Sequence, residues 1–425
     1  MKRYAIPALA LLVSASATAQ TSGNWFDNAV EHAQAQLSQT AAQITTPGLF
    51  PRSVKSDYSL EQLCDAMECS ISDLKPEVEL NPHPTPAEFR QTHLVGYADW
   101  TSGFFPGSLW LAYRLTGDPQ LLVQAKRYTN MLLPVSKMTD THDLGFMAGC
   151  SYGNALRYAP ADSIKNVLVE TANNLASRFD PAIGCIRSWD FGPWNFPVII
   201  DNMMNLDFLY TASRLTGDKR YADIATKHAE TTLHNHFRPD HTCYHVVSYN
   251  PDGTLERRQT FQGKADESSW SRGQGWALYG FTETFRNTGR REFLDHAVAV
   301  ADMIMLRNKT ADLVPLWDFD AVYAPTTPRD ASAAAVIASG LIDLSRLVPD
   351  GQKYFDYAAR ILKSLASEAY LASVGTNNGF VLKHSTGSLP HGSEIDTPLN
   401  YADYYFLEAL CRYKEAVDAH AFTAR

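Results

Sequence analysis

LWLAYRLTGDPQLLVQAKRYTNML (residues 109–132) and LDFLYTASRLTGDKRYADIATKHAETTL (residues 206–233) are two versions of one phrase. Each begins with an apolar-periodic run, passes through Leu-Thr-Gly-Asp and continues into a second amphipathic run. The glycine suits the left-handed conformation that ends many helices, and the aspartate suits the capping position of the next helix. Each phrase therefore predicts two helices joined by a short turn.

The same hairpin pattern continues along the chain. A weaker third copy occupies residues 276–305, a fourth occupies residues 336–365, and residues 401–417 supply a last helix. An earlier helix is expected from Asn24 to Ile44. Strand patterns are few: residues 243–253 predict a hairpin, and residues 379–384 predict a strand. A series of helical hairpins with a long repeat fits either an open solenoid or a closed toroid.

The segments ahead of the inner helices favour the closed form. They carry polar and aromatic groups, which would converge on one mouth in a ring but spread out along a linear array. These segments are DWTSGFFPG (99–107), THDLGF (141–146), IIDNMMNL (199–206), SSWSRGQGW (268–276) and RDASAAA (329–335). Residues 50–98, rich in proline and charge, are expected to form an irregular lead-in rather than a domain.

The N-terminus predicts export. Lys2 and Arg3 precede a short apolar run, and the small residues Ala17-Thr18-Ala19 fit a cleavage site that leaves Gln20 first in the mature chain. The apolar run is too short to span a bilayer, and no later segment is long and apolar enough. We therefore expect residues 1–19 to be a signal peptide and the mature protein to be periplasmic.

The amino-acid composition limits the classes of molecule that this protein is expected to bind. The net charge of −9 over 425 residues, without a basic stripe, argues against nucleic-acid binding. The six cysteines contain no C-x-x-C pair. Cys64 and Cys69 are close enough in sequence to bridge, but buried free thiols are the preferred interpretation for most of the six.

Three acids occupy the segments that would meet at the mouth. Asp143 precedes a helix, Asp201 follows four apolar residues, and Asp99 lies in a similar position. Each has helix capping as its alternative role. The apolar run ahead of Asp201 predicts partial burial, which raises the pKa of a carboxyl group as a general acid requires. Enzymes that cleave glycosidic bonds usually do so with two carboxyl groups in one active site.

Aromatic and polar side chains in the same segments favour a carbohydrate cleft. Rim packing is the alternative for any one tryptophan, but five together suit the C–H faces of sugar rings. Arg272 lies between two of them and is the candidate partner of a substrate carboxylate. Gln274 and Asn202 are candidates for binding hydroxyl groups. The five tryptophans are Trp100, Trp189, Trp194, Trp270 and Trp276.

The histidines do not predict a metal site. HNHFRPDHTCYH (234–245) contains four of them, but their spacing matches no closed zinc pattern. His245 differs because it lies on a predicted strand and is expected to point into the cleft. The chain also lacks G-x-S-x-G and the phosphate-binding GxxxxGK[ST] motif, so no metal and no cofactor are expected.

These motifs, taken in order from about Asp99 to Arg412, resemble those of the unsaturated glucuronyl hydrolases, glycoside hydrolase family 88. ADYYFLEAL (402–410) belongs to the same set. The resemblance implies an (α/α)6 barrel: an all-α six-hairpin toroid with a few short β-hairpins at the mouth. It also implies a single catalytic domain over residues 20–425, with residues 20–98 as a helical and irregular lead-in.

The resemblance further implies a reaction. The substrates are oligosaccharides left by polysaccharide lyases, with a 4,5-unsaturated uronic acid at the non-reducing end, and the enzyme hydrates the C4–C5 double bond. Asp201 matches the family's acid/base aspartate, and Asp143 matches the aspartate that holds the C2 and C3 hydroxyls. The implied substrate-binding residues are Trp100, Trp189, His245, Gln262, Trp270, Arg272, Gln274 and Trp276.

One position departs from the family pattern. Some members have His-Gln ahead of the S-[ST]-W motif, where this chain has Phe261-Gln262, and phenylalanine cannot exchange a proton. The resemblance favours glycosaminoglycan-type substrates but leaves heparan, chondroitin, hyaluronan, gellan and xanthan fragments open. The alternatives are an unsaturated rhamnogalacturonyl hydrolase acting on pectin fragments and a non-catalytic glycan-binding toroid.

Overall fold

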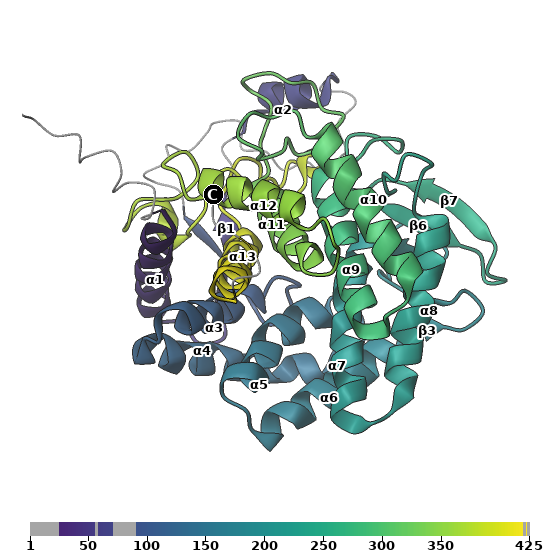
Figure 1. The fold of residues 1–425 in the computed structure, drawn as a ribbon, viewed down its shortest axis with the longest axis horizontal. Coiled ribbons are helices and arrows are strands. Elements are labelled where there is room, and N and C mark those ends of the chain that lie inside the picture. Colours follow the sequence, from purple (N-terminus) through teal and green to yellow (C-terminus); the bar gives the residue numbers. More distant parts are fainter. Residues whose placement is uncertain (1–24, 56–57, 71–90, 420–421, 423–425) are drawn as a thin grey trace, which may run out of the picture.

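The helices of the protein form two concentric rings (Figure 1). The computed structural model describes residues 25–55, 58–70, 91–419 and 422. The predicted signal peptide lies outside them. In the inner ring each element contacts the next, and the last contacts the first. Its members are α3 (Phe104–Thr116), η4 with α5 (Gly145–Gly153, Asn154–Tyr158), α7 (Leu206–Thr216), α9 (Ser271–Thr288), α11 (Ala331–Ser345) and α13 (Asn400–Asp418).

An outer ring of helices covers the inner one. The predicted six-hairpin toroid is therefore confirmed, and the ring is closed by the packing of α13 between α3 and α11. The outer helices are α1 (Trp25–Gln43), α4 (Pro119–Met131), α6 (Asp162–Ser177), α8 (Lys219–Asn235), α10 (Arg291–Arg307) and α12 (Gln352–Leu365).

The repeated Leu-Thr-Gly-Asp phrase makes the turn that was predicted for it. Gly117 ends α3 with a φ of 72°, and Gly217 ends α7 with a φ of 76°. The side chains of Asp118 and Asp218 then accept hydrogen bonds from backbone N–H groups in the first turns of α4 and α8. Only glycine enters the left-handed region at low cost, and the aspartate satisfies a free helical donor.

The inner helices are surrounded on every side, and their sequences reflect it. Every residue of α11 is buried, and the helix is built mainly from alanine, serine and aliphatic residues. A helix that is apolar all round belongs in the centre of a protein. By contrast, α12 carries its buried residues on one face and exposes the other, as an outer helix must.

Short strands lie at one end of the barrel. β6 (Val246–Tyr249) pairs antiparallel with both β5 (Pro197–Ile199) and β7 (Leu255–Gln259), which confirms the hairpin predicted at 243–253. β3 (Phe179–Asp180) and β4 (Cys185–Ile186) form a second pair. The strand predicted at 379–384 is wrong. Only an isolated bridge between Leu371 and Leu382 forms there.

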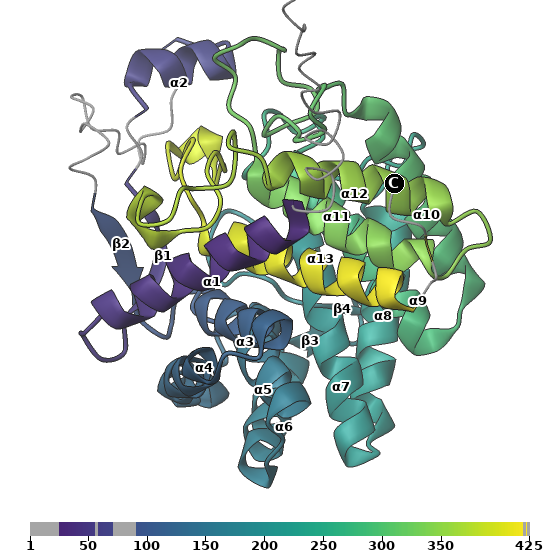
Figure 2. The same ribbon diagram turned by 60° about the vertical axis from the view of Figure 1, so that its left-hand side comes forward.

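The lead-in is more regular than predicted. β1 (Phe50–Val54) pairs antiparallel with β2 (Thr92–Val95), and α2 (Leu60–Met67) lies between them in the sequence. Figure 2 shows these elements beside the loop that precedes α13. Four short turns complete the structure: η3 (Leu133–Lys137), η5 (Ile200–Asn205), η6 (Asn377–Gly379) and η7 (Leu389–His391).

Two further expectations concern the whole chain. All six cysteines lie in the described part of the chain and none forms a disulfide, so Cys64 and Cys69 do not bridge. Among the described residues, no helix combines the length and apolar character needed to cross a membrane.

Candidate active site

The predicted site residues gather where the inner helices begin. Asp143 directly precedes the helical segment η4–α5, Asp201 lies in η5 just ahead of α7, and Arg272 lies in the first turn of α9. Trp100 precedes α3, and Tyr401 lies in the first turn of α13. Because the inner helices close into a ring, their first turns face one opening, as the sequence predicted.

Asp201 is a buried carboxyl group. β5 delivers it from the apolar run that precedes it, and only 7% of the residue is exposed. Burial raises the pKa of Asp201 to about 7, and the charge of Asp143 adds to the rise, while Arg272 and the indole N–H of Trp276 oppose it. A carboxyl group with a pKa near neutrality is populated both as an acid and as a base, as proton transfer in both directions requires.

His245 lies beside Asp201, and its hydrogen bonds fix which ring nitrogen carries the proton. Its Nδ1 atom accepts hydrogen bonds from the backbone N–H groups of Phe261 at 3.0 Å and Gln262 at 3.1 Å. Burial, with help from the charge of Arg272, lowers its pKa well below the usual value, so the ring is neutral. The single proton therefore sits on Nε2, which lies 3.6 Å from Asp201 Oδ2. At this distance the neutral imidazole faces the carboxyl group without bonding to it, and neither atom has another hydrogen-bond partner in the described part of the chain.

Asp143 does not use its side chain as a helix cap. Its carboxylate accepts a hydrogen bond from the Thr141 hydroxyl at 2.8 Å and lies 3.3 Å from His142 Nε2. The N–H of Phe146 is satisfied instead by Asn205 Oδ1 at 3.0 Å. Capping is thus assigned to another residue, and the Asp143 carboxylate is available at the site with 14% of its side chain exposed.

Aromatic side chains form a wall beside His245. Trp189 is half-buried, and its ring lies 5.8 Å from His245, 5.1 Å from Phe261 and 5.0 Å from Phe191. Phe191 is 56% exposed, which is unusual for so large an apolar side chain. Phe261, which stands where some family members have histidine, extends this wall.

Trp270 and Trp100 lie against other parts of the site. The buried Trp270 ring lies 4.7 Å from the His245 ring, so it positions the histidine. Trp100 is half-buried and packs at 5.1 Å on Tyr401 and at 5.6 Å on Phe146. Gln262 donates from its side chain to the Gly387 carbonyl at 3.2 Å.

The place of Arg272 differs from the prediction. Its side chain is 1% exposed, and its terminal nitrogens donate to Asp330 Oδ2 at 2.7 Å and to the carbonyls of Thr386 and Gly387 at 2.6 Å. The guanidinium also lies over the Trp270 ring at 4.6 Å. With these partners it is occupied by the protein, so the arrangement assigns it the ordering of the 386–387 loop and the tuning of Asp201.

Gln274 and Trp276 are likewise internal rather than exposed to a substrate. Gln274 is fully buried, and its amide bonds with both the N–H and the carbonyl of Cys243, at 2.8 and 3.3 Å. Asn202 is also buried, and donates to the Ile186 carbonyl at 2.9 Å. The sequence could not reveal these bonds to backbone groups, and substrate binding by Gln274, Trp276 and Asn202 stays a prediction.

One part of the site has no sequence motif. Arg52, in β1, pairs with Asp99 and with Glu394, each at 2.7 Å. Asp99 therefore joins the lead-in to the mouth instead of acting as a free acid. Burial raises the pKa of Glu394, but Arg52 outweighs it and holds that pKa below its usual value. The cluster of Arg52, Asp99 and Glu394 forms through a long-range contact between β1 and the loop that contains Glu394. No local sequence motif predicts it.

The histidine-rich stretch does not assemble a ligand set. His236 is buried and its Nε2 lies 3.1 Å from the Val198 carbonyl, so it fastens α8 to β5. Within residues 25–55, 58–70, 91–419 and 422, no three His, Cys, Asp or Glu side chains are grouped as a metal ion would need.

Comparison with known proteins shows similarity to unsaturated glucuronyl hydrolases. The chain is 44% identical over 330 residues to an unsaturated glucuronyl hydrolase of Formosa agariphila, covering 76% of this chain and 82% of the relative. It is 28% identical to an unsaturated chondroitin disaccharide hydrolase of Streptococcus pyogenes, covering 85% and 94%. Among solved structures, an unsaturated glucuronyl hydrolase specific for heparin matches with a TM-score of 0.82 and 46% identity, covering 94% and 100%.

A second solved structure, the unsaturated glucuronyl hydrolase of Bacillus sp. GL1, matches with a TM-score of 0.79 and 27% identity, covering 92% of this chain and 97% of that one. Residues 81–413 match the model of Glycosyl Hydrolase Family 88. The protein is a member of Glycosyl Hydrolase Family 88.

Proposed function

We propose that this enzyme removes the 4,5-unsaturated uronic acid from the non-reducing end of lyase-generated oligosaccharides by hydrating the C4–C5 double bond. The observation that carries the proposal is the buried Asp201, with its pKa raised to about 7, facing the Nε2–H of a neutral His245 and close to Asp143. The relatives named as unsaturated glucuronyl hydrolases support the same reaction.

The chemistry follows from the two protonation states of Asp201. The neutral acid delivers its proton to C4, a water oxygen bonds to C5, and the Asp201 carboxylate takes a proton from that water. The product is a hemiketal at C5. It opens to a C5 ketone, and the hydroxyl left on C1 then collapses to an aldehyde and releases the rest of the saccharide. One water is consumed, and Asp201 returns to its starting state.

His245 and Asp143 support this cycle in different ways. The Nε2–H of His245 stabilises the Asp201 carboxylate while it accepts the proton from water. Asp143 is an acceptor-only carboxylate and suits the sugar hydroxyls at C2 and C3. Its negative charge also raises the pKa of Asp201, so its removal affects both binding and proton transfer.

Fragments of glycosaminoglycans are the proposed substrates, with heparin-derived disaccharides first. The support is the 46% identity to the unsaturated glucuronyl hydrolase specific for heparin. The half-buried Trp189 and the exposed Phe191 offer flat apolar faces for the neighbouring sugar ring.

The enzyme is also proposed to be exported to the periplasm after cleavage at Ala19. The support is the charged and apolar start of the chain and its Ala17-Thr18-Ala19 site. Mass spectrometry of protein from the periplasmic fraction tests this: a mature chain beginning at Gln20 is expected, and an intact Met1 would contradict export.

Loss of ultraviolet absorbance tests the reaction, because hydration destroys the conjugated enoate. Wild type and Asp201→Asn are compared on unsaturated disaccharides from heparin, chondroitin and gellan, with matched circular dichroism spectra as the control for folding. We expect absorbance loss with wild type on the heparin product and none with the variant. Activity confined to pectin-derived fragments would favour a rhamnogalacturonyl hydrolase, and no activity on any fragment would favour a glycan-binding toroid.

A further inference from the structure

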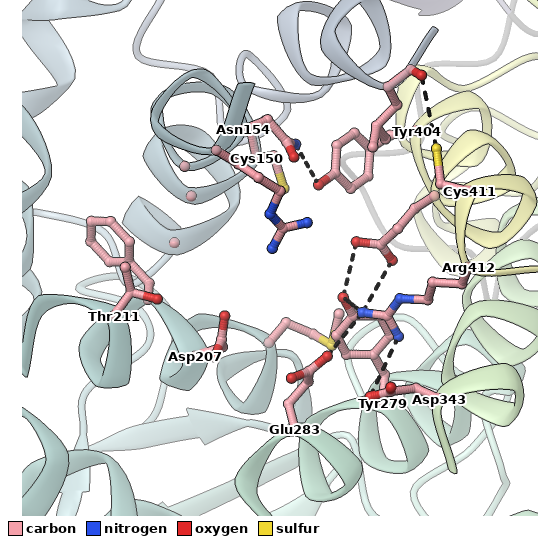
Figure 3. A pocket seen from close by; sticks show the side chains of 18 of the residues that line it. Cys150, Asn154, Asp207, Thr211, Tyr279, Glu283, Asp343, Tyr404, Cys411 and Arg412 are labelled. Atoms are coloured by element: carbon pink, nitrogen blue, oxygen red, sulfur yellow. Dashed lines mark hydrogen bonds and ion pairs between the residues drawn. The ribbon is translucent and has the colours of Figure 1, made fainter. Parts of the chain in front are cut away.

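A second polar cavity lies inside the barrel, away from the active site. Its volume is about 670 Å³, which lies within the range of small-molecule sites. The inner helices line it with their central and C-terminal parts, such as Tyr279 to Asn287 of α9 and Asp343 of α11, whereas Asp143 and Asp201 precede such helices. Figure 3 shows Asn154 and Tyr404 on one side of this space and Asp207 and Glu283 on the other.

Most of the charges in the cavity are already paired. Five arginines and five acids line it. Arg412 donates to Glu283 at 2.9 Å and lies 3.8 Å from both Asp343 and Glu408. Arg286 lies 3.2 Å from Glu283. These acids are therefore held by the wall itself.

Three groups in the cavity are not satisfied in this way. Among the described residues, no carboxylate lies within ion-pair distance of Arg157 or of Arg346, and the Arg157 guanidinium contacts the Tyr158 hydroxyl. The Tyr405 side chain lines the cavity, and its hydroxyl has no hydrogen-bond partner in the described part of the chain. A ligand or water in the cavity can bond to this hydroxyl.

The arrangement of ion pairs favours an anion. Glu283 is held by Arg286 and Arg412, and Glu415 lies 3.8 Å from Arg114, which is not part of the cavity lining. Among the described residues, Arg157 and Arg346 are therefore the cavity arginines left without a carboxylate. A guanidinium binds carboxylates with paired hydrogen bonds.

We propose that this cavity is a second binding site for a small hydroxylated carboxylate of the sugar-acid class, with Arg157 as partner of the carboxylate and Tyr405 as partner of a hydroxyl. The volume suits a monosaccharide-sized ligand. Thr211 and Asn154 place further polar groups at the wall, and the Phe208 ring gives an apolar face. This site is independent of the proposed reaction.

A thin aromatic layer separates the two sites. The Tyr405 ring lies 5.3 Å from the Trp276 ring, and the Trp276 N–H acts on Asp201. The second site thus touches the reverse side of the wall that bounds the catalytic carboxyl. Substitutions of Arg157 leave that wall in place, so turnover at the mouth should stay unchanged.

Calorimetric titration of the full-length enzyme with sodium glucuronate tests the proposal, with glucose and inorganic phosphate as further probes. Arg157→Met keeps much of the side-chain bulk and removes the charge. The matched control is Arg214→Met, because Arg214 also lines the cavity but is engaged by Asp207 at 3.8 Å and by the Thr211 hydroxyl at 2.7 Å. We expect Arg157→Met to weaken glucuronate binding about tenfold or more, Arg214→Met to leave it unchanged, and glucose not to bind.

A milder variant guards against misfolding. Tyr405→Phe removes only the unpartnered hydroxyl, and we expect it to weaken glucuronate binding about fivefold. Glucuronate binding that survives Arg157→Met, or that Arg214→Met weakens equally, would overturn the site. Phosphate binding as tight as glucuronate would overturn the sugar-acid class. Arg157-dependent binding in an enzyme that leaves unsaturated disaccharides intact would sink the proposed reaction while the second site stands.

Discussion

Asp201 links burial to chemistry at the scale of a single residue. Because its pKa is about 7, the proton-donating form is abundant at neutral pH and scarce above it. We expect kcat to fall about tenfold per pH unit once the pH exceeds that value, since C4 receives its proton from the neutral acid. A pH–rate profile on the unsaturated disaccharide checks this. A rate that stays constant to pH 9 would show that another group donates.

His245 allows a second test at this scale. In His245→Asn, the amide oxygen can replace Nδ1 as acceptor for the N–H groups of Phe261 and Gln262, while the Nε2–H that faces Asp201 is lost. Loss of a donor to a carboxylate raises its pKa. The descending limb of the pH–rate profile should therefore move to higher pH, and kcat should fall about tenfold or more.

The exposed His234 provides the matched control, because His234→Asn changes the same side chain away from the site. Its profile should overlay that of wild type. A His245→Asn enzyme with lower kcat but an unmoved profile would limit this histidine to contact with the substrate.

At the scale of the element, a hydrogen bond joins the segments that carry the two proposed catalytic acids, Asp143 and Asp201. Asn205 of η5, the element that carries Asp201, accepts the N–H of Phe146 in η4, which follows Asp143. A Cβ on Gly145 would lie 2.5 Å from Asn205 Oδ1, closer than such atoms approach. Gly145→Ala should therefore push η4 and η5 apart, lower the free energy of unfolding by about 1–3 kcal/mol and reduce kcat.

Gly149→Ala is the comparison for that prediction. It lies in the same element, and its Cβ would meet Phe208 at 3.7 Å, an ordinary contact. Urea unfolding and kcat measured on both variants decide the matter. Equal effects would show that the helical segment, rather than its contact with η5, is sensitive to the added methyl group.

Local patterns predicted the helical hairpins because their signals are local: an apolar period, a glycine and a capping aspartate. The strand expected at 379–384 failed for a long-range reason. The N–H groups of Val381 and Leu382 donate to the Asp403 carboxylate of α13, at 3.0 and 2.8 Å, in place of a neighbouring strand. The internal partners of Arg272 were hidden for the same reason, since they lie 58 residues or more along the chain, and its role towards a substrate stays a prediction.

At the scale of the whole molecule, closure of the ring was predicted because a closed ring brings together the polar and aromatic segments that precede the inner helices. The packing of α13 between α3 and α11 confirms it. The lead-in was beyond such reasoning. Arg52 reaches Asp99 and Glu394 only because β1 lies against the loop that ends at α13, and neither β1 nor that loop carries a repeat.

Closure also makes the stability of the whole molecule depend on pH. Asp201 and Asp403 are buried in the barrel, and burial raises the pKa of each to about 7 from an ordinary value of 3.8. Acids of the opposite kind, such as Asp190 beside Arg178, have lowered pKa values and protect the fold at higher pH. Their contribution is lost only in strong acid. The buried His228 and His236, whose pKa values burial lowers to about 3 and about 4, lose their contribution as the pH falls below 6.5, so the maximum of stability should lie near about pH 6.

The sign of the Asp201 contribution makes this testable. A raised folded-state pKa gives stability that is complete below about pH 4 and is lost as the pH rises through about 7, because the unfolded chain ionises first. A shift of about three pKa units corresponds to roughly 4 kcal/mol. Asp201→Asn should therefore exceed wild type in free energy of unfolding by up to about that amount at pH 8 and lose the advantage near pH 4.

Asp162→Asn, on an exposed carboxyl of α6, is the control. Urea unfolding at both pH values gives the answer: an advantage independent of pH would mean that Asp201 is already ionised in the folded enzyme and that the proton for C4 comes from elsewhere.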